Sequence, residues 1–284
     1  MSITGRVPTT FDTNKFVPEQ FSKNVLVAVK SNLVATPRFN HSYEKDLVKG
    51  DILYIPLTNT VTATEITVGK ELVDSNAFNT SAVTLSIGYY YGAKHTIDVM
   101  TRRQSQVDVY SAAEVENAYA VEKAIDSSVC ALFSALGGSS IAGADGSAWT
   151  DDILIAAVEY LDEADAPEKD RVWISDPSTK ADIMKIDKFT RQDYFAADAV
   201  PTGTFRKDIY GAPLLITNNL TAYSTGSYGV YAHKDAIAIA ISENPNSFMV
   251  EQKELHQVLL ETDALWGVVE LRDTFGYPIY TRLA

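Results

Sequence analysis

The chain has 284 residues, a formal net charge of −13 and 46% hydrophobic residues. That length and composition allow a packed core in one large or two medium domains and exclude wholesale disorder. Non-specific DNA binding needs clustered Lys and Arg, so the acidic balance argues against a DNA-gripping surface. Cys130 is the only cysteine, which rules out an intramolecular disulfide, and its apolar neighbours predict a small buried side chain.

The N-terminal region lacks the basic and apolar segments of a signal peptide, and the chain has no apolar run long enough to span a membrane. Residues 1–21 are polar and have no sustained period, so we expect an extended arm. A helical pattern follows over residues 19–34 and ends near Pro37. Its apolar face consists of Phe21, Val25, Leu26, Val29 and Leu33.

A long polar hairpin is predicted next. Residues 52–57 are rich in β-branched and aromatic side chains, which favours a strand. Residues 58–91 form a two-stranded excursion whose return strand alternates Val83, Leu85 and Ile87 with polar residues. Because an isolated hairpin is marginal in water, we expect another subunit to support it. The alternative is a hairpin that folds back onto its own domain.

Two features near the base of this hairpin predict packing rather than chemistry. Tyr89, Tyr90 and Tyr91 form an aromatic cluster that core or interface packing explains without a cofactor. His95 is a lone histidine on a predicted strand, for which a structural role is expected.

The longest helical signal covers residues 111–136, roughly 39 Å at 1.5 Å per residue. Ser111 and Glu114 have the spacing of a capping box, and Gly137-Gly138 is a stop signal. The pattern predicts a stiff rod around which the other elements are arranged. Its predicted face is Val115, Tyr119, Glu122, Ile125, Val129, Leu132 and Leu136.

A Gly/Ser/Ala linker at 137–146 marks a boundary, after which helices and strands alternate. Thr150 is the expected N-cap of the first helix. We expect a long loop at 190–207, and a strand at 236–241 that is apolar on both faces and so covered on both sides. The other expected elements are helices at 151–166 and 176–186 and strands at 171–175, 214–217 and 229–232.

Asn244-Pro245-Asn246 predicts a second boundary. The strands expected beyond it need a partner, and the long helix is the obvious one. The sequence therefore predicts an α+β fold in which the helix and the C-terminal strands form one unit and residues 151–242 are inserted as a second. The C-terminal strands are expected at 248–251, 257–260, 265–271 and 276–283.

The sequence contains no Walker-type phosphate loop, no G-x-G-x-x-G opening a helix and no G-x-S-x-G. Its histidines are far apart, without the spacing of metal ligands; they are His41, His95, His233 and His256. Two acidic pairs, Asp151-Asp152 and Asp162-Glu163, are expected on a solvated helix face rather than in acid–base catalysis. We expect no catalytic, cofactor-binding or metal-binding residues, and hence a structural protein.

The order of these parts resembles the major capsid proteins of tailed bacteriophages with the Hong Kong 97 fold. Short segments along nearly the whole chain are similar to that family and appear in its order. Residues 49–56 (KGDILYIP) resemble the strand entering the extended loop, while 104–109 (QSQVDV) and 120–126 (AVEKAID) resemble the spine helix and its entry. Residues 210–214 (YGAPL) and 233–237 (HKDAI) resemble segments of the axial domain.

The resemblance implies a division of the chain: an N-terminal arm at 1–50, an extended β-hairpin loop at 51–99, a peripheral domain with the spine helix at 100–150 and 243–284, and an inserted α/β axial domain at 151–242. The arm and the extended loop would reach across neighbouring subunits, and the 190–207 loop would lie near the centre of a pentamer or hexamer. Some members cross-link a lysine of the extended loop. Lys70 lies there, but nothing in the sequence establishes that chemistry.

The resemblance also implies a function and partners. The chain would self-assemble into pentamers and hexamers of an icosahedral shell that encloses double-stranded DNA without sequence-specific binding or a membrane. Assembly would take place in the host bacterial cytoplasm, followed by procapsid maturation. No long charged helical segment precedes the arm, so a separate scaffolding protein is expected, with a portal and possibly a decoration protein.

Three alternatives remain open at this point. A cellular nanocompartment shell of the encapsulin type has the same fold and would need a cargo-binding groove. A soluble α/β enzyme built on residues 151–242 belongs to a different class, and a monomer with a stable hairpin would favour it. A tail or adhesive structural protein would differ in the symmetry of its assembly.

Overall fold

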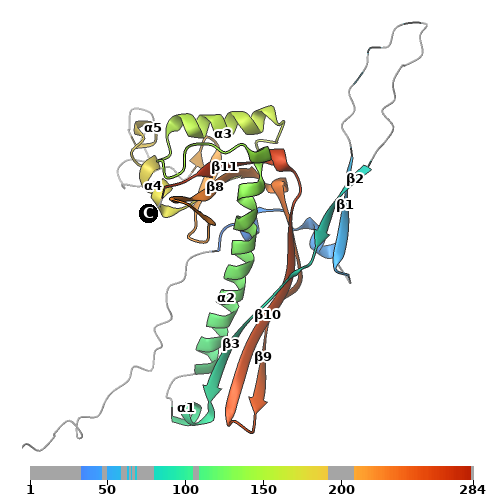
Figure 1. Cartoon of the computed structure of the whole chain (residues 1–284), viewed down its shortest axis with the longest axis vertical. Coiled ribbons are helices and arrows are strands. Elements are labelled where there is room, and N and C mark those ends of the chain that lie inside the picture. The colour runs from blue at the N-terminus through green and yellow to red at the C-terminus, as the bar shows by residue number, and fades with distance from the viewer. Residues whose placement is uncertain are drawn as a thin grey trace, which may run out of the picture.

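The computed structural model describes residues 33–46, 50–58, 63, 65, 68, 80–104, 109–190 and 208–282. Figure 1 shows three regions: an α/β unit at one end, a long helix beside an extended sheet, and a hairpin that projects from that sheet. The α+β class is as expected. The predicted arm, nearly all of the predicted 19–34 helix, Lys70 and residues 191–207 lie outside the described residues.

The long helix α2 (Val109–Ala131) continues into the 3-10 helix η4 (Leu132–Ala135). Gly137 and Gly138 follow with φ of +76° and +58°, so the predicted stop is confirmed. The predicted cap is wrong, because Ser111 lies inside the helix.

The predicted face of α2 is also partly wrong, because Val115 and Glu122 are exposed. Apolar spacing could not find the true face, since two of its members are polar groups buried through hydrogen bonds. The buried residues are Ala113, Asn117, Val121, Ile125, Asp126, Val129 and Cys130.

An antiparallel sheet of three long strands lies along α2, in the order β3 (Tyr89–Asp98), β10 (Gln257–Glu270), β9 (Ile237–Gln252). Between β3 and α2 the chain forms the short helix α1 (Val99–Gln104). The boundary expected at residues 244–246 is wrong, because β9 runs through them without a break. An edge strand tolerates Pro245, since one side of its backbone has no strand to donate to.

Side-chain alternation gives this sheet two different faces. On one face, Ala264 and Trp266 of β10 pack against Val121 and Ile125 of α2. On the opposite face of the sheet, the projecting hairpin covers the part that lies nearest the α/β unit.

The hairpin consists of β1 (Ile52–Thr58) and β2 (Thr80–Ser86), and both predicted strands are confirmed. Its inward residues Ile55 and Leu85 are buried against Ala238 and Ala240 of β9. The two layers approach so closely that a Cβ at Gly267 would lie 2.4 Å from the backbone oxygen of Ser86. The described base of the hairpin therefore folds back onto its own chain, the alternative that the sequence left open.

The α/β unit contains a six-stranded sheet in the order β11-β8-β4-β6-β5, with β7 also paired to β8. Only β4 and β6 are parallel. The strands predicted near 171–175, 214–217 and 229–232 are confirmed. The sheet strands are β4 (Arg171–Ser175), β5 (Asp208–Ile209), β6 (Ala212–Ile216), β7 (Ala222–Tyr223), β8 (Gly226–His233) and β11 (Gly276–Tyr280).

Three helices accompany this sheet: α3 (Asp151–Glu163), α4 (Pro177–Ile183) and α5 (Asp187–Thr190). Thr150 occupies the predicted N-cap position, but its side chain makes no capping hydrogen bond. The last strand contradicts the sequence prediction, because β11 pairs with β8 of this unit rather than joining the long helix.

The core of the α/β unit is aromatic. Trp173 is fully buried, stacks on Tyr231 with ring centroids 3.9 Å apart, and meets Trp149 edge-on at 5.9 Å. Its indole N–H donates to the backbone oxygen of Ile209 over 3.0 Å, which satisfies the one polar group of the ring.

Candidate functional site

His41, His95 and Cys130 lie in different parts of the chain, and each has its own surroundings. His95 Nδ1 lies 2.6 Å from the side-chain oxygen of Asn117, and His41 Nδ1 lies 2.6 Å from Glu44. Burial, and then the charge of Asp126, raise the pKa of the Cys130 thiol, which opposes thiolate formation. Within the described residues, no three His, Cys, Asp or Glu side chains gather as metal ligands would.

The acidic pairs of α3 lie on a largely solvated helix face, as predicted, and Asp151 is the only one of the four acids that is partly buried. Asp162 forms an ion pair of 2.7 Å with Arg171, whose side chain is 4% exposed. Asp151 binds Lys188 and Tyr210. Asp152 and Glu163 are exposed, as predicted. One acid of each pair therefore makes a tertiary contact, which neighbouring sequence alone does not reveal.

Asp126 is a buried junction between three parts of the chain. Its Oδ1 accepts hydrogen bonds from the backbone N–H groups of Ala35 (3.0 Å) and Thr36 (2.9 Å) and from the Thr36 hydroxyl (3.1 Å). Its Oδ2 accepts one from the Asn219 amide over 3.0 Å. The carboxylate thus joins α2 to the segment leading from the N-terminal arm and to the α/β unit.

Beyond the hairpin, none of the elements that the structure describes covers the face of the three-stranded sheet opposite α2. The register places Phe248 opposite Glu261, Val250 opposite Leu259, and Tyr90 opposite Leu265 on that face. Phe248, Val250 and Tyr90 are 41%, 43% and 65% exposed. We call these three residues the outer-face patch.

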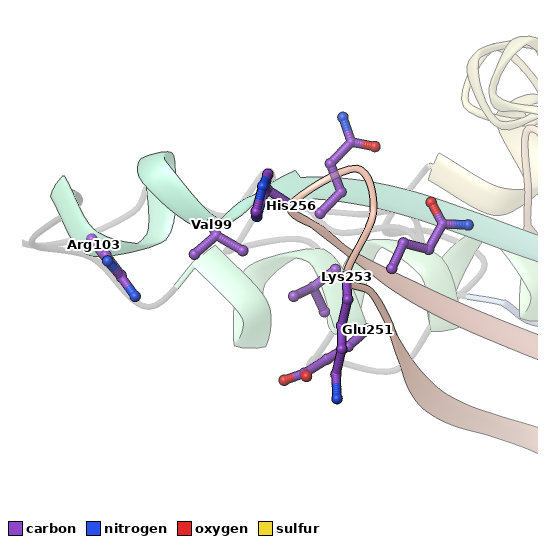
Figure 2. Close-up of a pocket in the computed structure, with 8 residues that line it drawn as sticks. Val99, Arg103, Glu251, Lys253 and His256 are labelled. Atoms are coloured by element: carbon purple, nitrogen blue, oxygen red, sulfur yellow. The ribbon is translucent and has the colours of Figure 1, made fainter.

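A depression of about 510 Å³ lies at the far tip of the sheet, between α1 and the β9–β10 turn. Figure 2 shows Arg103 on α1, Glu251 on β9 and Lys253 on the β9–β10 turn, with His256 beside Val99. The backbone N–H of Val99 donates to the oxygen of His256 over 3.1 Å, which ties α1 to the turn. The labelled charges are of both signs, and Arg103 lies apart from Glu251 and Lys253, so the geometry suits surface contact better than a small ligand.

Sequence reasoning missed the Asp126 junction and the outer-face patch. Asp126 could have been identified from the sequence, because it is a lone acid between Ile125 and Val129. A charged side chain on the apolar face of a helix needs a buried partner. No local signal identified the patch, because it depends on which strands pair. No helix in the described part of the chain has the length and apolar character needed to cross a membrane.

The chain is similar to known proteins both in its sequence family and in its fold. The chain matches the family model described as phage capsid protein over residues 80–277. None of the curated proteins matches the sequence. Several solved structures share the fold at low sequence identity.

A Mycobacterium phage Che8 chain aligns with a TM-score of 0.80 at 20% identity, covering 94% of this chain and 97% of that one. A chain from the capsid of the cyanophage P-SCSP1u aligns with a TM-score of 0.76 at 15% identity, covering 100% and 99%. A chain from the mature capsid of bacteriophage PhiM1 aligns with a TM-score of 0.72 at 14% identity, covering 93% and 91%. These likenesses concern the fold. Because the family model spans more than half of the sequence, the chain belongs to the phage capsid protein family and is a structural protein rather than an enzyme.

Proposed function

We propose that copies of this chain assemble into pentamers and hexamers of an icosahedral shell enclosing phage double-stranded DNA. The observation that carries this proposal is the outer-face patch, which exposes an aromatic and aliphatic surface beside the projecting hairpin. Phe248 and Val250 lie two residues apart on the same face of β9, and exposed apolar side chains grouped in this way favour a protein–protein contact. Membership of the phage capsid protein family supports a second copy of the chain as the partner.

The proposed roles follow the expected division: an arm at 1–50, an extended loop at 51–99, a peripheral domain at 100–150 and 243–284, and an axial domain at 151–242. The structure does not separate the parts at these borders, because α1 spans residues 99 and 100, β9 spans residues 242 and 243, and β11 pairs with β8. The division therefore names positions in the shell rather than parts that fold separately.

The start of the described chain gives the arm a fixed point of departure. Asn40 forms a parallel bridge with Ala238 of β9, and Ala35 and Thr36 bind Asp126. An arm held in this way at its root can reach a neighbouring copy without disturbing its own subunit. Many such contacts per subunit would add multivalently in a closed shell.

Further partners belong to the same proposal: a separate scaffolding protein, a portal and a possible decoration protein, with assembly in the host bacterial cytoplasm and subsequent procapsid maturation. DNA would be enclosed without sequence-specific binding. The net charge of −13 would limit adhesion of the DNA to the shell.

The test of the proposal is the assembly state of the purified full-length chain. Light scattering at rising protein concentration and electron microscopy should reveal capsomers and closed shells with five-fold and six-fold positions. A chain that remains monomeric both alone and when co-expressed with the proposed scaffolding protein would contradict the proposal.

A second measurement tests the cargo. Particles purified from phage-producing cells should contain nuclease-resistant double-stranded DNA. Particles filled with an enzyme instead would favour the nanocompartment alternative.

A further inference from the structure

Three basic residues from separate segments line one depression of about 450 Å³ at the edge of the α/β unit. Arg38 comes from the start of the described chain, Lys169 from the loop between α3 and β4, and Lys234 from the turn between β8 and β9. Such a gathering is unexpected in a chain with 24 basic and 37 acidic residues. It gives an acidic molecule a local site that attracts negative charge.

The three cations are available to a ligand. Within the part of the chain that the structure describes, none of their side chains takes part in an ion pair, and all three residues are exposed. Arg171 also lines the depression, but its side chain is buried and its charge is paired with Asp162 over 2.7 Å. The positive charge that a ligand would meet therefore comes from Arg38, Lys169 and Lys234.

Hydrogen bonds tie the three segments to one another. The side-chain amide of Asn40, which closely follows Arg38, donates to the Asp235 carboxylate over 2.7 Å. The backbone N–H of Lys234 donates to the backbone oxygen of Asp170 over 3.2 Å. Each segment is thus held beside its basic residue, which lowers the cost of ordering the site when a ligand binds.

The loop that carries Lys169 is also fixed from within. The Arg171 guanidinium donates to the backbone oxygens of Ala166 over 2.6 Å and of Pro167 over 2.9 Å. Asp170 has a left-handed backbone, with φ of +65°, which a non-glycine residue keeps when its surroundings hold it there. Lys169 therefore lies on a braced turn.

A phosphate group fits this arrangement better than a carboxylate does. It carries more charge and more acceptor oxygens on one central atom, so it can meet donors on several sides at once. Arg binds phosphate through its planar fork, and Lys binds it as a point charge. Glu168 and Asp170 also line the depression, and their charges oppose an anion, so we expect a moderate affinity.

We propose that Arg38, Lys169 and Lys234 form a binding site for a phosphate group. The group can come from free phosphate or from the backbone of double-stranded DNA, which presents the same kind of oxygen. A contact with a DNA phosphate carries no sequence information, so the site is compatible with enclosure of DNA without sequence-specific binding. Binding at the site does not require shell assembly.

Titration calorimetry with inorganic phosphate on the unassembled full-length chain tests the site. The wild type should bind phosphate saturably, and chloride at the same ionic strength should give no such heat. Lys169→Ala and Lys234→Ala should each weaken binding about tenfold, because each removes a hydrogen bond between charged groups. Both side chains are exposed, so the variants should fold normally.

Two further variants separate the site from overall charge. Lys123→Ala removes the same charge from an exposed position on α2, and should bind phosphate as the wild type does. Glu168→Gln removes an opposing charge from the depression and should tighten binding several-fold. No saturable binding in the wild type, or equal weakening in Lys123→Ala, would overturn the proposal.

Fluorescence anisotropy with a short DNA duplex identifies the source of the phosphate. If the DNA backbone occupies the site, Lys234→Ala should weaken binding alike for unrelated sequences and lower the salt slope of the binding constant by about 1, whereas Lys123→Ala should not. Inorganic phosphate should then compete with the duplex. Phosphate binding without these effects on DNA would assign the site to free phosphate. Failure of both titrations would overturn the site and leave the proposed shell untouched, because electron microscopy tests the shell separately.

Discussion

The two sheets of this molecule differ in how completely they are covered. The six-stranded sheet has its central strand, β4, buried along its whole length. The three-stranded sheet is covered by α2 on one face and only partly by the hairpin on the other. The first region thus resembles a self-sufficient domain, whereas the second leaves the outer-face patch for other molecules. Stability and assembly should depend on different parts of the chain.

The largest expected effect is in the α/β core. Trp173→Ala removes a fully buried ring that contacts Tyr231 and Trp149. We expect a loss of about 4 kcal/mol in the free energy of unfolding, measured by urea denaturation of the unassembled chain. Met184→Ala, at a 42% exposed position, is the control and should change little. A small effect of the tryptophan variant would contradict the self-sufficient core.

Asp126→Ala tests the junction between the two regions. It leaves four hydrogen-bond donors without their acceptor, two of them in fully buried hydrogen bonds, and we expect a loss of about 3 kcal/mol in the free energy of unfolding. Glu122→Ala, one turn earlier on an exposed part of α2, should be nearly neutral.

Asp126→Asn should be milder. The side-chain oxygen of Asn219 has no hydrogen-bond partner among the described residues, so a flipped Asn219 can accept from the new amide. Chemical denaturation of all three variants checks the order. If the alanine and asparagine variants were equally unstable, the acceptor argument would be wrong.

Gly267→Ala probes the contact between the hairpin and its own sheet. The new Cβ would meet the Ser86 backbone oxygen at 2.4 Å, so the hairpin must shift. We expect a loss of about 2 kcal/mol, with faster hydrogen exchange in 80–86. Gly88→Ala is the matched control, because a Cβ there meets nothing within 4 Å. Unchanged exchange in Gly267→Ala would mean that the hairpin base does not rest on β10.

A pH dependence is expected at α4. Burial opposes ionisation of Asp182, but hydrogen bonds from Arg282 and Lys185 outweigh it and hold the pKa of Asp182 below its ordinary value. Because the folded pKa is the lower one, this contribution is complete above the unfolded value and disappears as pH falls through the folded value. The denaturation midpoint should therefore fall as the pH drops below about 4, and fall less in Asp182→Asn. Asp152→Asn should follow the wild type.

The smallest effect on stability is expected at the outer-face patch. Phe248→Ser and Val250→Ser should each change the free energy of unfolding by less than about 0.5 kcal/mol, because both side chains are exposed. The same substitutions should lower the yield of shells in the assembly experiment. If these substitutions lowered stability strongly and left assembly unchanged, the outer-face patch would serve folding rather than assembly.

Sequence reasoning succeeded where the signal is local. The long helix, its glycine stop, the strands at 52–57 and 171–175 and the α+β class all follow from periodicity and turn residues. It failed where partners are distant. The turn signal of residues 244–246 coincides with a register shift between β9 and β10 rather than with a boundary, and β11 pairs with β8 across the chain.

The candidate sites were less predictable than the fold. Asp126 and Asp151 depend on residues tens of positions away, Asn219 and Tyr210 among them. The residues next to Asp126 and Asp151 in the sequence do not show which distant residues will contact them. The outer-face patch likewise exists only once the strand register is fixed.

The unbroken strand β9 has a mechanical consequence. Its 16 residues start beside the α/β unit and end at the far tip of the sheet. At about 3.3 Å per residue this is a lever of roughly 50 Å, so turning one end by about 5° displaces the other by between about 4 and 5 Å. Slight tilts near the α/β unit would translate into adjustments of several ångströms at the tip, on the scale that changes of curvature between neighbouring copies require.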